Sequence, residues 1–107
     1  MKLIYDQNPP INIRNLMLKI GYHEHYDRHS QQSSYVSPLG SAYYPRFHIY
    51  IKQKNNGDLL LDLHLDQKKA SYKGTKAHSG ESDSSVVLEE GARIQRWLDY
   101  VKLTPTR

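Results

Sequence analysis

The chain has 107 residues and carries 15 lysines and arginines against 11 acids, so its formal net charge is +4 at pH 7. The absence of cysteine excludes disulfides and thiolate metal sites, and no run approaches the roughly 18 apolar residues that a membrane span needs. We therefore expect one domain, residues 1–107, in the cytoplasm, with an anionic partner favoured by the charge.

The first clear element is a helix that ends at Gly21. Its apolar residues recur at the spacing of one helical face: Ile13, Leu16, Met17 and Ile20. Asn12 is placed to cap the start, with Asn8 as the alternative, and Gly21 supplies the left-handed residue that ends the helix. Residues 2–5 before it fit either a short strand or a tail.

Residues 23–29 read HEHYDRH and raise the question of a metal site. In an extended chain, His23, His25, Asp27 and His29 would point one way, and imidazole with carboxylate suits zinc or a harder divalent ion. The spacing fits neither of the two histidine metal motifs that come close to it. We favour a polar connector, with a metal site or an anion contact as alternatives, and we predict no metal or other cofactor.

The strongest element is a β-hairpin over residues 46–66. A three-residue turn that pairs Lys54 with Asp58, with Gly57 in the left-handed position, sorts the side chains onto two faces. The apolar face has Phe47, Ile49, Ile51, Leu61, Leu63 and Leu65. The polar face has Arg46, His48, Tyr50, Asp62, His64 and Asp66. A two-residue turn would mix the two sets.

The polar face of the hairpin has candidate catalytic residues. His48 lies opposite His64 with Cβ atoms about 5 Å apart, close enough for an acid and base pair acting on a phosphate ester. If the protein is an enzyme, the residues are His48, His64, Asp66 and His78. A ligand-free face held by the cross-strand pairs Arg46–Asp66 and Tyr50–Asp62 is the alternative, so enzyme activity stays open.

A basic loop follows the hairpin at residues 67–80. Lysines neutralise phosphates and a tyrosine stacks on a base, so the expected nucleic-acid contacts are Lys68, Lys69, Tyr72, Lys73 and Lys76, with Arg46 and Tyr50 as a neighbouring surface. A solvated loop that keeps the protein soluble is the alternative.

The last helix is expected over residues 85–101. Its apolar stripe is Val87, Gly91, Ile94, Leu98 and Val101, with Trp97 alongside. Gly91 costs about 1 kcal/mol of helix propensity, which indicates a close approach to the sheet.

Taken together, these elements predict an α+β fold in α-β-β-β-α order. The N- and C-terminal helices pack on one face of a small antiparallel sheet, whose third strand comes from residues 34–37. This order, with Lys68, Lys69 and Lys73, resembles the double-stranded-RNA-binding domain, although a glycine-containing loop separates these lysines from the last helix.

Our leading functional prediction is a small basic domain that binds nucleic acid, RNA in preference, without catalysis. A histidine- or metal-dependent phosphoesterase or nuclease on the polar face of the hairpin is the alternative, and a protein-interaction adaptor is the weaker one. Another phosphate-bearing ligand also fits, no membrane partner is expected, and the sequence leaves the oligomeric state open.

Overall fold

The computed structural model describes residues 1–28, 30–67, 80–81 and 84–103. The strands in these residues are β1 (Lys2–Tyr5), β2 (His23–Asp27), β3 (Gln32–Pro38), β4 (Arg46–Gln53), β5 (Leu59–Asp66) and β6 (Gly80–Glu81). The helices are a short α1 (Ile13–Lys19) and a long α2 (Ser85–Leu103). The expected order α-β-β-β-α is wrong, because β1, β2 and β6 join the three expected strands and the chain begins with a strand.

The strands form one antiparallel sheet in the order β1-β5-β4-β3-β2. β4 occupies one edge of β5, while β1 and β6 share the other edge, opposite residues 59–62 and 65–66. Between them the Met1 backbone donates to the Leu63 oxygen at 2.9 Å and accepts from the Leu63 nitrogen at 2.7 Å. Segments from before and after the β4–β5 hairpin therefore close this edge of β5.

The register expected for β4 and β5 is confirmed. His48 pairs with His64 and Arg46 with Asp66. The turn closes where the Lys54 nitrogen donates to the Asp58 oxygen at 2.7 Å. Gly57 has a φ of +94°, a conformation that only glycine adopts without steric cost. The alternating leucines of β5 thus enter the core: Leu59, Leu61, Leu63 and Leu65.

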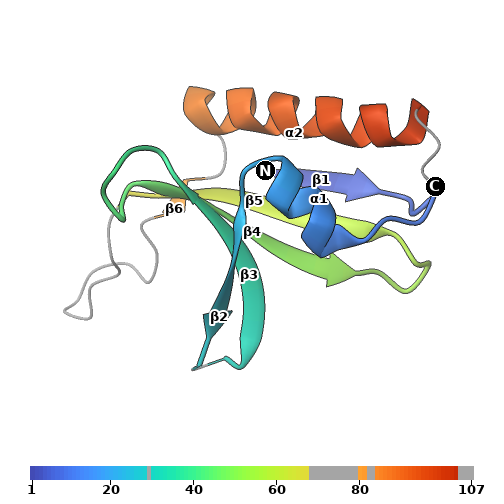
Figure 1. Ribbon diagram of the computed structural model, residues 1–107, viewed down its shortest axis with the longest axis horizontal. Helices are drawn as coiled ribbons and strands as arrows, with labels where there is room; N and C mark the ends of the chain where they lie inside the picture. Colours follow the sequence, from blue (N-terminus) through green and yellow to red (C-terminus); the bar gives the residue numbers. More distant parts are fainter. Residues whose placement is uncertain (29, 68–79, 82–83, 104–107) are drawn as a thin grey trace.

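Residues 23–27 form the edge strand β2, so the expected connector is wrong. Each residue of β2 pairs with β3. This backbone pairing stabilises the strand, although its polar side chains do not show the alternation typical of a strand. β3 pairs with β4 only over residues 35–38. The outer half of the β2–β3 hairpin therefore extends past β4, at the bottom of the view in Figure 1.

The expected ends of α1 are confirmed. The Asn12 side chain accepts from the Asn15 nitrogen at 3.0 Å, and Gly21 ends the helix with a φ of +99°. The Tyr22 nitrogen then donates to the Met17 oxygen at 2.8 Å. This turn sends the Tyr22 ring into the core, where it is fully buried.

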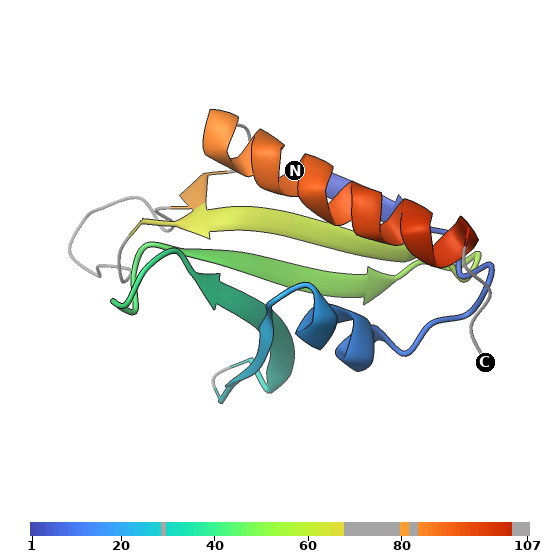
Figure 2. The same ribbon diagram turned by 45° about the horizontal axis from the view of Figure 1, so that its top comes forward.

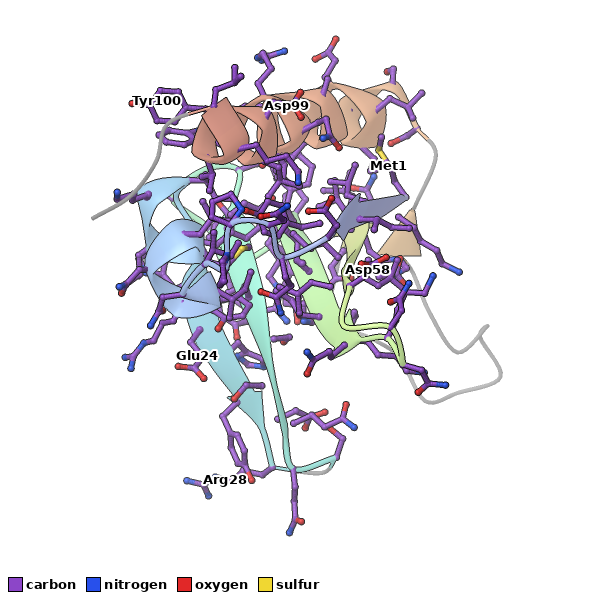
Figure 3. All side chains as sticks on the ribbon, turned by 90° about the vertical axis from the view of Figure 1, so that its right-hand side faces the viewer. Met1, Glu24, Arg28, Asp58, Asp99 and Tyr100 are labelled. Atoms are coloured by element: carbon purple, nitrogen blue, oxygen red, sulfur yellow. The ribbon has the colours of Figure 1, made fainter. Side chains whose placement is uncertain are left out.

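α2 lies along β1 and β5, as Figure 2 shows. Four of the five residues of the expected stripe are buried, namely Val87, Gly91, Ile94 and Leu98, while Val101 is partly buried. A Cβ at Gly91 would lie 2.2 Å from the Met1 sulfur, and Figure 3 shows Met1 directly beneath α2. In the described part of the chain, neither helix combines the length and apolar character needed to cross a membrane.

Polar bonds tie the two helices together on the apolar side of the sheet. The Tyr22 hydroxyl donates to Glu90 at 2.7 Å. Arg93 donates to both oxygens of Glu90, at 2.9 and 2.7 Å, and to the Ile20 oxygen at 2.8 Å. Residues of α1 and α2 share one core with β1, β4 and β5, so the helices cover the same face of the sheet.

Candidate functional site

The sheet face away from the helices carries polar side chains from four strands. The strand registers place five of them together, and we call these the polar cluster: His25, Ser34, Arg46, His48 and Asp66. The helices lie on the other side of the sheet, at the top and left of Figure 3.

Three side chains of the polar cluster form a continuous chain of hydrogen bonds. Ser34 Oγ lies 2.7 Å from His48 Nε2, and His48 Nδ1 lies 2.9 Å from Asp66 Oδ2. Because a carboxylate only accepts, Nδ1 carries the proton of a neutral His48 and Nε2 accepts from the serine hydroxyl. Ser34 and His48 are 3% and 6% exposed. We call this chain the Ser34 relay.

Arg46, one of the expected nucleic-acid contacts, is a buried cation beside Asp66 of the Ser34 relay. Its Nε lies 3.5 Å from the same Asp66 Oδ2, and its guanidinium carbon lies 4.6 and 4.7 Å from the ring centres of Tyr43 and Tyr44. Its buried Nη1 has no hydrogen-bond partner among the described residues.

Asp66 is held as a carboxylate by its two neighbours. Burial alone would raise the pKa of Asp66, but the hydrogen bond and charge of His48 and the charge of Arg46 outweigh it. The pKa of Asp66 therefore lies below its usual value, so the acceptor of the Ser34 relay is ionised near neutral pH.

Tyr50 comes between the two histidines that the hairpin places opposite each other. Its ring stacks on His48 at 4.3 Å and 26° and meets the edge of His64 at 5.8 Å and 73°. His64 Nε2 instead lies 3.3 Å from Asp62. The two imidazoles expected to act as an acid and base pair are thus bound to different carboxylates.

His25 joins β2 to the polar cluster. Its ring meets the His48 ring edge-on at 6.1 Å. Burial first, and then the charges of Arg46 and His48, lower the pKa of His25, so its ring is neutral near pH 7. Among the described residues, which exclude His29, no three histidine, aspartate or glutamate side chains are placed to hold a metal ion.

The expected basic contacts lie outside the described residues. These are Lys68, Lys69, Tyr72, Lys73 and Lys76, together with the catalytic candidate His78. Their roles stay predictions.

A groove of about 490 Å³ opens between the helices, and the sequence analysis missed it. Its lining residues are Lys19 from α1 and Arg93, Arg96, Trp97 and Tyr100 from α2; we call this the helix groove. The residues from α2 recur at i, i+3, i+4 and i+7, so they form one stripe beside the buried one. This basic and aromatic stripe is the sequence signal that would have found the groove.

No protein-family model, curated protein or solved structure matches this chain.

Proposed function

We propose that the protein binds single-stranded nucleic acid, RNA in preference, and that the helix groove is its contact surface. The observation that carries this proposal is that cationic and aromatic side chains line the same groove. The +4 charge of the chain supports it, because phosphate neutralisation supplies most of such affinity.

Lys19 and Arg96 are the phosphate contacts of the helix groove. Both are exposed, and no acid lies within ion-pair distance of either among the described residues. Arg93 differs, because Glu90 and the Ile20 oxygen already take its donors. Lys19 and Arg96 therefore remain available for phosphates. Arg93 instead links α2 to Ile20 at the end of α1.

Trp97 and Tyr100 are the base contacts. Their rings meet edge-on at 6.0 Å and 84°, and Tyr100 is 57% exposed. Figure 3 shows Tyr100 projecting from α2 away from the sheet. Stacking of one base on such a ring contributes about 1–3 kcal/mol without a strong preference for sequence.

The polar face of the sheet is a weaker candidate because its charges cancel. In the described residues it carries Lys2, Arg46 and Lys52 against Asp27, Asp62 and Asp66. In this proposal the lysines of the basic loop are a second set of phosphate contacts. The proposed compartment is the cytoplasm, where the protein would meet single-stranded RNA.

Fluorescence anisotropy with a labelled 12-nucleotide RNA tests the proposal. We expect the pair Lys19→Ala and Arg96→Ala to weaken binding at least tenfold and to flatten the slope of log affinity against log salt by about 1.4, or 0.7 for each lost phosphate contact. Tyr100→Ala weakens binding by a similar factor with the slope unchanged.

The matched control removes the same charge from the other side of the protein. Lys2→Ala with Lys52→Ala takes two exposed lysines from the sheet face away from the helices. If this control weakens binding as much as the groove pair does, the protein acts only through its net charge. If the unmodified protein does not bind RNA at 50 mM salt, the proposal is wrong.

The expected alternative, a phosphoesterase using His48, His64, Asp66 and His78, stays a prediction. His48 and Asp66 are bonded to each other, while His64 bonds to Asp62. This geometry favours chemistry at His48 alone over an acid and base pair.

A further inference from the structure

The Ser34 relay has the connectivity that turns a serine hydroxyl into a nucleophile. A base nitrogen lies 2.7 Å from the hydroxyl oxygen, and a carboxylate 2.9 Å from the other ring nitrogen fixes the tautomer of that base. The ionised Asp66 also stabilises the imidazolium that forms when His48 takes the proton.

The position of Ser34 offers a way in for a substrate. β3 pairs with β4 over residues 35–38. Ser34 is the residue next to Tyr35, so it lies where the two strands begin to diverge. The Tyr50 ring, which is 48% exposed, stacks on one face of the His48 ring. Ser34 itself is 3% exposed, so access requires the Tyr50 ring to rotate away or the outer hairpin to move outward.

A purely structural network explains these contacts less completely. Replacing such buried polar groups by apolar ones of similar shape is commonly neutral or stabilising. In addition, the buried Nη1 of Arg46 has no acceptor among the described residues. A buried donor without a partner is unusual in a network that serves the fold alone.

We propose that Ser34 is a nucleophile activated by His48, and that the polar cluster hydrolyses carboxylic esters through an acyl-serine intermediate. Ser34 Oγ forms a bond to the carbonyl carbon while its proton passes to His48 Nε2. The bond from that carbon to the alcohol oxygen then breaks, and this oxygen takes the proton from Nε2.

Water repeats the sequence on the acyl-serine. Its oxygen bonds to the acyl carbon, its proton passes to Nε2, and the bond to Ser34 Oγ breaks as the proton returns to Oγ. The products are an alcohol and a carboxylic acid, and no oxidant or reductant takes part. Asp66 is the positioning residue, because it fixes the proton of His48 on Nδ1.

Labelling of the full chain with an alkyl fluorophosphonate tests the proposal, because Oγ replaces fluoride on phosphorus by the same activation. We expect one adduct, located at Ser34 by peptide mass analysis, and none in Ser34→Ala. The matched control Ser33→Ala changes the exposed neighbour on the opposite face of β3 and keeps the adduct.

The rate of labelling tests the roles of the neighbours. His48→Gln slows labelling by at least about 100-fold, the usual contribution of a general base. Tyr50→Ala, which uncovers the relay, speeds it. Asp66→Asn removes the carboxylate that fixes the Nδ1 proton, so the pH profile of its labelling rate differs from that of the unmodified protein.

The outcomes that overturn the proposal do not depend on any variant folding. They are an unmodified protein without an adduct at Ser34, or equal labelling of Ser33 and Ser34. Circular dichroism and Trp97 fluorescence show whether each variant keeps the fold. None of these results bears on RNA binding by the helix groove.

Discussion

Asp66→Ala is the substitution that measures what the polar cluster contributes to the fold. Asp66 accepts from His48 and Arg46, whose side chains are only 8% and 6% exposed. Its removal leaves the His48 N–H without an acceptor, at about 1–3 kcal/mol. It also leaves the Arg46 charge unpaired, for which about 3–5 kcal/mol is typical in a fully buried pair.

The total for Asp66→Ala falls close to or below the sum of the two lower limits, about 4 kcal/mol. The Asp66 side chain is 23% exposed, so water can replace part of the lost carboxylate. We expect a loss of about 3–5 kcal/mol in the free energy of unfolding, a large part of the 5–15 kcal/mol of an ordinary domain. For a chain of this size the Tm should fall by about 12 °C or more.

Asp62→Ala is the matched control on the same strand and face. Asp62 and its partner His64 are both 30% exposed and lie 3.3 Å apart. A partly exposed pair of this kind, in which only the imidazole would carry the positive charge, contributes about 0–1 kcal/mol. Urea unfolding followed by the fluorescence of Trp97, the single tryptophan, gives both values. Costs for the two substitutions within 1 kcal/mol of each other would refute the reasoning from burial.

Two further predictions concern acid and the contact beneath α2. The pKa of Asp66 is depressed in the folded protein. The stabilisation by Asp66 is therefore fully present above the unfolded pKa of about 3.9 and is lost as pH falls through the folded pKa. The difference in free energy of unfolding between the protein and Asp66→Asn, measured with urea at several pH values, should shrink below about pH 4. Gly91→Ala should change stability by less than about 1 kcal/mol, because the helix propensity gained offsets displacement of the flexible Met1 tip. Gly91→Leu should cost about 2 kcal/mol by overpacking, and equal costs for both would show that Met1 cannot yield.

Elements with a local pattern could be predicted from the sequence. The alternation around Gly57 left one register that separates the faces, and the structure has that register. The ends of α1 depended on Asn12 and Gly21, whose effects act within one turn of helix. In each case the deciding residues lie a few positions apart.

The parts that failed depend on partners far along the chain. β2 was missed because an edge strand with one neighbour buries little, and four of its five residues are exposed. The order of elements was wrong for the same reason, since β6 pairs only over two residues of β5.

Ser34 had no signal in the sequence at all. Its partner His48 is 14 residues away, and Asp66 lies a further 18 along. Only the registers of three strands bring these side chains together. The helix groove, by contrast, was visible as a stripe on α2 from Arg93 to Tyr100 and needed only α1 to complete it.

The enclosure of β5 has a consequence for the way the chain acquires its structure. β4 is connected to β5 by a short turn. β1, by contrast, pairs with residues of β5 that lie about 60 positions later in the chain, and β6 follows β5. Contacts so distant form slowly because a long loop closes first. On the ribosome, β1 is synthesised before β4 and β5 but would thus pair after them.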